Sequence, residues 1–199
     1  MRIILGSASK ARQELLKSLG FEFEVRSANI DEKAIRSDDF RQLPLLLAKA
    51  KSEAIQKDLD EPAILVTSDS VAVYKDELRE KPKSEAEAKQ FLQDYATHPV
   101  DVITAVYVIN TATEQSASGV ESGKTYFHKI PDTVIHELIQ HGAIMHAAGG
   151  FIIELPAIKK YIAHIEGNMD TIMGLPKILT KQLIEKVHPH TKSGGNKRN

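Results

Sequence analysis

Two segments of the chain combine residue types that can bind phosphate groups. The first is Ser7-Ala8-Ser9-Lys10-Ala11-Arg12, which follows a short apolar run. Hydroxyl groups, the free amides at a helix start and a guanidinium together form a natural phosphate site. A simple helix cap followed by a solvated surface is the competing interpretation, and on this segment alone it is the better one. The second segment is Glu80-Lys81-Pro82, with Lys51 as its companion. Most surface lysines are merely solvated, but beside a triphosphate they would offset its negative charge.

Acidic residues add candidate metal ligands and a candidate base. Asp31 and Glu32 are adjacent in a loop, where solvated charge is the ordinary interpretation. If a further carboxylate joins them in space, they become suitable oxygen ligands for Mg²⁺ or Mn²⁺. Asp69 lies in Ser68-Asp69-Ser70, between two apolar runs, where an ionised carboxylate rarely occurs without a partner. It is either a turn residue in a hairpin or the general base of a reaction.

The elements that must position these residues predict one α/β domain. Apolar or alternating runs predict strands at residues 3–5, 21–25, 63–67 and 71–74, and two longer strands at 100–110 and 119–130. Apolar residues at helical spacing predict helices at residues 11–19, 40–59, 84–95, 131–142 and 176–187. Residues 1–187 then form the domain. The Lys-, Gly- and Asn-rich residues 188–199 predict a disordered tail.

Composition excludes several classes of protein. The 199 residues contain no cysteine, so disulfides, thiolate nucleophiles and Cys-ligated metals are absent. The net charge of -1 lacks the basic excess of most nucleic-acid-binding proteins, so no nucleic-acid partner is expected. No apolar run approaches the roughly 18 residues of a membrane helix, and we expect a cytoplasmic protein without a membrane partner. The sequence contains neither a P-loop motif nor a His-Glu-x-x-His zinc motif.

Taken in order, these motifs resemble the Maf family of nucleotide pyrophosphatases over residues 2–187. The family's opening motif Leu-Ala-Ser-x-Ser-x-x-Arg appears as Leu5-Gly6-Ser7-Ala8-Ser9-Lys10-Ala11-Arg12. Its later motifs appear as Asp31-Glu32, Leu47-Ala48-Lys49-Ala50-Lys51, Ser68-Asp69-Ser70-Val71, Glu80-Lys81-Pro82, Ala148-Gly149-Gly150-Phe151 and Met173-Gly174-Leu175-Pro176. Each motif is weak alone, but the ordered set is specific. The branch found in eukaryotes such as plants is the most similar.

The resemblance implies an elongated α/β domain with a long twisted mixed sheet and two lobes around a central cleft. It also implies a divalent cation, Mg²⁺ or Mn²⁺, and hydrolysis of a nucleoside triphosphate to a monophosphate and pyrophosphate. By resemblance, the catalytic residues are Asp69, Lys51 and Lys81, and the metal ligands are Glu32 and Asp69. The residues expected to bind the substrate are Ser7, Ser9, Arg12, Ser70 and Glu154.

The base of the nucleotide stays open at this point. Ser70 and Glu154 depart from the Thr and Gln of the family branch that acts on dTTP and UTP, and the Ser68-Asp69 pair and Glu154 are closer to the branch that acts on 7-methyl-GTP. An acidic side chain accepts hydrogen bonds from guanine N1–H and the exocyclic amine better than a glutamine does. The aromatic residue of that branch's first motif is missing, because Lys10 and Ala11 stand there.

Other readings compete with this one. A close relative acting on purine triphosphates such as ITP would have the same motifs, and so would a non-catalytic regulator of cell division or a nucleic-acid-binding protein that shares the fold. Members of the family are often dimers, so a homodimer is an open alternative that no apolar stripe in the sequence establishes.

Overall fold

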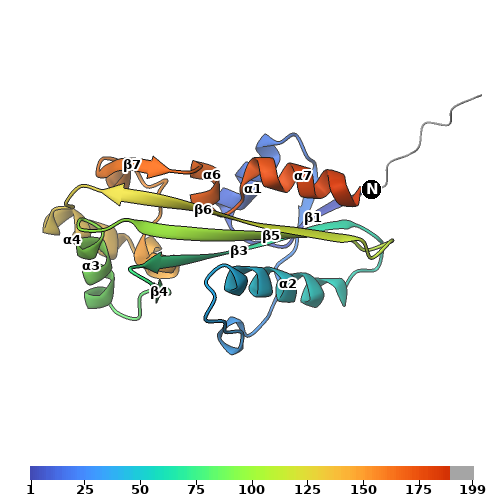
Figure 1. Cartoon of the computed structure of the whole chain (residues 1–199), viewed down its shortest axis with the longest axis horizontal. Coiled ribbons are helices and arrows are strands. Elements are labelled where there is room, and N and C mark those ends of the chain that lie inside the picture. The colour runs from blue at the N-terminus through green and yellow to red at the C-terminus, as the bar shows by residue number, and fades with distance from the viewer. Residues whose placement is uncertain (189–199) are drawn as a thin grey trace, which may run out of the picture.

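The computed structural model describes residues 1–188, so apart from His188 the predicted disordered tail lies outside the described residues. Its centre is one seven-stranded sheet, whose long strands β3, β5 and β6 run along the longest axis of the molecule in Figure 1. The strands are β1 (Ile3–Leu5), β2 (Phe23–Val25), β3 (Ile64–Tyr74), β4 (Glu77–Arg79), β5 (Val100–Asn110), β6 (Ser116–Phe127) and β7 (Ile162–Glu166). Their order is β2-β1-β3-β5-β6-β7, and β4 pairs with the far end of β3. β1 is parallel to β2 and β3, whereas the other pairs are antiparallel, which makes the sheet mixed.

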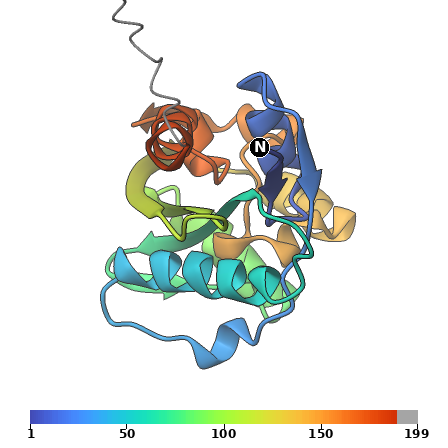
Figure 2. The same cartoon turned by 90° about the vertical axis from the view of Figure 1, so that its right-hand side faces the viewer.

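Three helices cover the half of the sheet that contains β1 and β2. Helix α2 (Gln42–Gln56) lies on one face, and α1 (Lys10–Ser18) and α7 (Lys177–Val187) lie on the other (Figures 1 and 2). Apolar residues explain this arrangement. Leu43 and Leu47 of α2 pack on Val71 of β3, while Leu16 of α1 and Leu183 of α7 share a cluster on the opposite face. Within residues 1–188, no helix is both long and apolar enough to cross a membrane.

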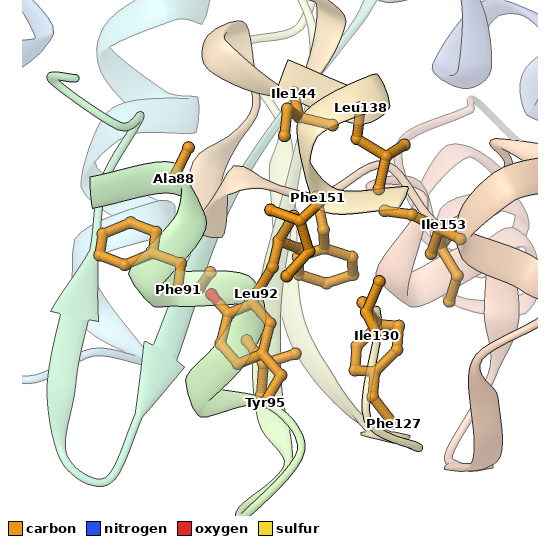
Figure 3. Packing of buried hydrophobic residues seen from close by; sticks show 14 of the residues in the cluster. Ala88, Phe91, Leu92, Tyr95, Phe127, Ile130, Leu138, Ile144, Phe151 and Ile153 are labelled. Carbon is orange, nitrogen blue, oxygen red and sulfur yellow. The ribbon is translucent and has the colours of Figure 1, made fainter. Parts of the chain in front are cut away.

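The other half of the sheet is covered by shorter elements. They are α3 (Glu85–Asp94), α4 (Asp132–His141), α5 (Pro156–Lys159), α6 (Met169–Ile172) and the 3-10 turns η2 (Ala143–His146) and η3 (Ala148–Gly150). A further 3-10 turn, η1 (Glu32–Ala34), precedes α2. Figure 3 shows the aromatic centre of this half, where Tyr95 is stacked on Phe127 and Phe151 meets both rings edge-on. Buried aromatic rings contribute large apolar areas, so this cluster fixes the short elements to the sheet.

The structure confirms the α/β class and most of the expected elements, with corrections. Residues 64–74 form one unbroken strand, so the alternative of a hairpin turn at Asp69 is wrong. β6 begins three residues earlier and ends three residues earlier than predicted. The helix predicted over 40–59 spans Gln42–Gln56, and Leu46, predicted on its apolar face, is exposed. The strands β4 and β7 were not predicted, because three to five residues carry too little periodicity.

Candidate active site

Asp69 lies at the midpoint of β3, where it is only 8% exposed. Successive side chains of a strand point to opposite faces. Ser68 and Ser70 therefore point away from α2, and Asp69 points toward it. The residue opposite Asp69 on β5 is Ala105, whose small side chain leaves room beside the carboxylate. One carboxylate oxygen, Oδ1, accepts a hydrogen bond of 2.8 Å from the Ser70 amide, which leaves Oδ2 to interact with other groups.

Lys51 joins the two acidic segments identified in the sequence. It projects from α2, and its Nζ contacts Oδ2 of Asp69 and lies 2.7 Å from Oε1 of Glu32. Asp31 does not take part, because its carboxylate accepts from the Lys33 amide and caps η1. The predicted pairing of carboxylates across the fold is thus observed for Glu32 and Asp69, which share one ammonium group.

Electrostatics follow from these contacts. Burial raises the pKa of Glu32, but the hydrogen bond and charge of Lys51, with Lys81 and Arg12 further away, outweigh it and hold that pKa below its usual value. Burial lowers the pKa of the Arg12 guanidinium, and the charges of Asp69 and Glu32 act in the opposite direction. A carboxylate that stays ionised beside cations suits a metal ligand.

Arg12 is held on the other side of β3. Its Nε donates to the Gly174 carbonyl at 2.9 Å, Nη1 to the Ser68 carbonyl at 3.0 Å and Nη2 to the Ser70 hydroxyl at 3.1 Å. A guanidinium has five N–H groups, so two remain for a ligand. Gly174 adopts φ +98°, and a Cβ there would lie 2.8 Å from Nε of Arg12, so a glycine is required for this contact.

The segment before Arg12 forms the start of α1. Ser9 caps the helix by accepting from the Arg12 amide at 3.4 Å, and Ser7 accepts from the Ser9 amide at 3.2 Å. The amides of Lys10 and Ala11 form no hydrogen bond within residues 1–188. Free amides at a helix N-terminus attract anions. Both the cap and the phosphate-site interpretation of this segment are thus compatible with its geometry, because the serines cap the helix while its amides stay available.

These residues line one large pocket of about 1060 Å³ between the two halves of the molecule. All of the predicted site residues border it: Ser7, Ser9, Arg12, Glu32, Lys51, Asp69, Ser70, Lys81 and Glu154. Lys and Arg outnumber Asp and Glu along its walls by eight to four, although the whole chain carries a net charge of -1. The pocket is therefore a locally positive site, as a polyphosphate ligand requires.

The structure brings some predicted residues into direct contact and leaves others apart. Lys51, Asp69 and Glu32 touch, and Arg12 touches Ser70. Lys81 is exposed, and Glu154 is partly exposed. Neither forms a hydrogen bond or ion pair with another described residue, so both are available to a ligand. Lys10, Lys33, Arg36, Lys83 and His146 also line the pocket, and the sequence interpretation gave them no role. Most of these residues lie next to a motif in the sequence, and that position is the one signal that could have indicated a place in the pocket.

Comparison with known proteins agrees with this geometry. The model of the Maf-like protein family matches residues 2–187. The chain belongs to this family. Among its relatives is a protein of Dictyostelium discoideum named 7-methyl-GTP pyrophosphatase, 40% identical over 93% of this chain and 96% of the relative. A dTTP/UTP pyrophosphatase of Vibrio parahaemolyticus is 30% identical over 94% of this chain and 97% of the relative.

A further relative and a solved structure show lower identity. A nucleoside triphosphate pyrophosphatase of Synechococcus sp. is 29% identical over 93% of each chain. The solved structure of a dITP/XTP pyrophosphatase from Mycobacterium abscessus has a TM-score of 0.38 and 13% identity, over 66% of this chain and 76% of that one. The match of the family model confirms the sequence-based assignment to the Maf family, and many of the polar residues in the motifs that carried it line the pocket.

Proposed function

We propose that the chain hydrolyses a nucleoside triphosphate between its α- and β-phosphates, releasing a monophosphate and pyrophosphate. The observation that carries the proposal is the pair of carboxylates, Asp69 and Glu32, held by Lys51 at the base of a positive pocket. A triphosphate needs both positive charge around it and an oxygen-ligand site for its cation. Relatives that align over nearly the whole chain are named as pyrophosphatases of nucleoside triphosphates, which supports the same reaction here.

A divalent cation, Mg²⁺ or Mn²⁺, fits the residues of the pocket. Asp69 and Glu32 are hard oxygen donors close enough to contact one ammonium group. Within residues 1–188 no cluster of three or more His, Cys, Asp or Glu side chains could hold a metal. Two carboxylates suit Mg²⁺, which commonly takes its remaining ligands from water and substrate phosphates. When bound, the cation would neutralise charge on the phosphate oxygens.

The residues of the chain would supply the remaining chemistry. Oδ2 of Asp69 orients a water molecule and accepts its proton as the oxygen attacks the α-phosphorus. The new O–P bond forms as the bond from the α-phosphorus to the bridging oxygen breaks, and pyrophosphate leaves with the electron pair. Lys51, Lys81 and the two free N–H groups of Arg12 stabilise the negative charge that builds on this leaving group. The free amides at the start of α1 hold the phosphates.

We further propose that the base is a guanine, with 7-methyl-GTP as the preferred form. Glu154 presents a carboxylate to the pocket without a partner among the described residues. It can accept from guanine N1–H and the exocyclic amine, and methylation at N7 adds a positive charge that a carboxylate attracts. The higher identity to the 7-methyl-GTP relative than to the dTTP/UTP relative, 40% against 30%, supports this choice. The cytosol, where free nucleotides are used, is the proposed compartment.

The reaction is tested with a panel of nucleotides, including 7-methyl-GTP, GTP, ITP, dTTP and UTP, each assayed for pyrophosphate with Mg²⁺ and with Mn²⁺. We expect turnover that depends on the cation and is fastest with 7-methyl-GTP. Asp69→Asn should lower kcat by about 10²- to 10⁴-fold without loss of fold. A folded Asp69→Asn variant with full activity would refute the assigned role.

The choice of base is tested separately with Glu154→Gln. The variant should lose its preference for 7-methyl-GTP over UTP while hydrolysing UTP about as fast as the wild type. Equal loss on both nucleotides would assign Glu154 to the phosphates and remove the argument for guanine.

A further inference from the structure

A chain of hydrogen bonds runs from Thr104 on β5 to Arg12 in the pocket. The Thr104 side chain is fully buried, and its Oγ1 lies 2.8 Å from the Thr171 carbonyl and 2.8 Å from Oγ of Ser70. A hydroxyl group has one proton, and a carbonyl oxygen can only accept. The Thr104 proton is therefore committed to Thr171, and the contact between Thr104 and Ser70 must be donated by Ser70.

This assignment fixes the direction of the next bond. The only proton of the Ser70 hydroxyl points to Thr104, so its oxygen accepts from Nη2 of Arg12 at 3.1 Å. The two hydroxyl protons between the Thr171 carbonyl and the guanidinium, those of Thr104 and Ser70, are thus each directed to a single acceptor. Ser70 lines the pocket but has no proton to offer a ligand there. It presents only the oxygen lone pair that Arg12 leaves free.

We propose that Thr104, although it does not line the pocket, is a positioning residue that sets the hydrogen-bonding polarity of Ser70 and the orientation of Arg12. Phosphate oxygens only accept hydrogen bonds, so Ser70 cannot bind them as a donor. It accepts instead from a nucleotide hydroxyl group or from a water molecule. This inference rests on the proposed function, because it concerns the groups that meet the triphosphate.

Thr125 provides a matched control on the neighbouring strand β6. It is also fully buried, yet its Oγ1 has no hydrogen-bond partner within the described residues, and the residue does not line the pocket. Replacing either threonine by valine removes one buried hydroxyl from the same sheet at nearly constant volume. Only the change at Thr104 interrupts the chain of hydrogen bonds that leads to Arg12.

The experiment compares Thr104→Val, Thr104→Ser and Thr125→Val for kcat and KM on the best nucleotide of the panel. Thr104→Val should lower kcat by roughly 10- to 100-fold, because a displaced Arg12 no longer meets the charge on the leaving group. Thr104→Ser keeps the hydroxyl and should stay within about threefold of wild type. Thr125→Val should behave as wild type. A Thr104→Val enzyme with wild-type kcat, or a Thr104→Ser enzyme as slow as Thr104→Val, would overturn the proposal.

A double-mutant cycle with Ser70→Ala separates positioning from damage to the fold. Thr104 acts on Arg12 through Ser70, so Thr104→Val should lower kcat no further in the Ser70→Ala background. Its effect on Tm should persist there, because the Thr171 carbonyl loses its donor in either background. An equal loss of kcat in both backgrounds would mean a structural role alone and would contradict the inference.

Binding of inorganic pyrophosphate keeps the proposal testable if turnover fails. Calorimetry on the same variants should show about tenfold weaker binding for Thr104→Val and unchanged binding for Thr104→Ser and Thr125→Val. If the wild type hydrolyses no nucleotide, the proposed function fails, but this comparison still decides the role of Thr104. Equal affinities for all four proteins would overturn that role.

Discussion

Lys51 on α2 contacts Asp69 in the middle of β3, and the same ammonium group lies 2.7 Å from Glu32. In the absence of other ligands, one lysine thus bridges the two carboxylates proposed to hold a divalent cation and offsets one of their two negative charges. The Lys51 side chain is 15% exposed, and that of Asp69 is 12% exposed, so water screens this contact only partly. The ammonium group and a divalent cation compete for the same oxygens, which has a measurable consequence.

Lys51→Ala should therefore bind Mn²⁺ more tightly than the wild type when no nucleotide is present. It should also lower kcat by about 10²- to 10³-fold, because one cation that stabilises the leaving pyrophosphate is lost. Calorimetry with Mn²⁺ and a pyrophosphate-release assay measure the two effects. Lys49→Ala, on the same helix, removes an exposed lysine paired only with Glu53 and serves as the control. Weaker metal binding in Lys51→Ala would contradict the competition.

The lowered pKa of Glu32 predicts a dependence of stability on pH. A carboxyl group whose pKa is lower in the folded than in the unfolded protein stabilises the fold above the unfolded value. For Glu32 that value is near the ordinary 4.5, and the contribution disappears as the pH falls through the lowered pKa. The difference in free energy of unfolding between wild type and Glu32→Gln should shrink on acidification below this range. Urea titrations at several pH values measure it, and a difference that grows toward acid pH would show the opposite sign of shift.

Gly174→Ala should damage activity more than its effect on stability suggests. The positive φ costs an alanine about 1–2 kcal/mol, and its Cβ would also push against Nε of Arg12. Gly20→Ala is the matched control, because Gly20 has φ +83° and no atom within 4 Å of the added Cβ. Both variants should lose stability in thermal unfolding through the positive φ, and Gly174→Ala should lose somewhat more because of its contact with Arg12. Only Gly174→Ala should lose kcat, and an active Gly174→Ala enzyme would separate this glycine from the site.

Gly6 and Thr67 should behave as a coupled pair. A Cβ on Gly6 would lie 2.5 Å from the methyl group of Thr67, so Gly6→Ala overpacks the core and should cost about 1–3 kcal/mol. Thr67→Ser removes that methyl group but keeps the hydroxyl, which donates to the Ala48 carbonyl at 2.8 Å. The double variant should recover much of the stability lost in Gly6→Ala. Urea unfolding of all four proteins measures the coupling, and strictly additive losses would exclude it.

The sequence predicts which polar residues form the site, but it does not predict which of them are in contact. The order of motifs identifies Ser7, Arg12, Lys51 and Asp69, and the structure places all of them around one pocket. Their contacts could not be predicted, because they join segments far apart in the chain. The bond from Arg12 to Gly174 spans 162 residues, and no local pattern specifies it. The roles of Asp31 and Glu32 show the same limit, since two carboxylates adjacent in the same segment have different partners.

The long elements were predictable because their patterns repeat several times. β5 spans the predicted residues 100–110, and α4 begins at Asp132 as its Pro131-Asp132 start indicates. β3 was divided in the prediction because Ser68, Asp69 and Ser70 have low strand propensity. Ten successive residue pairs with β5 hold these residues in the strand nonetheless. Tertiary pairing outweighs local propensity here, at the position that the chemistry requires.

β3 is continuous and is paired with β5 from Ile64 to Val73. The strand that carries Asp69 therefore runs through both halves of the sheet without a break. Hinge closure around a ligand takes place at loop or element-terminal residues, and β3 has no such interruption between Ile64 and Tyr74. Glu32 and Glu154, by contrast, line the pocket from a short 3-10 turn and from a segment outside the sheet. In the proposed reaction, the residue that would orient the attacking water thus lies on an unbroken strand, and the residue proposed to recognise the base lies outside the sheet.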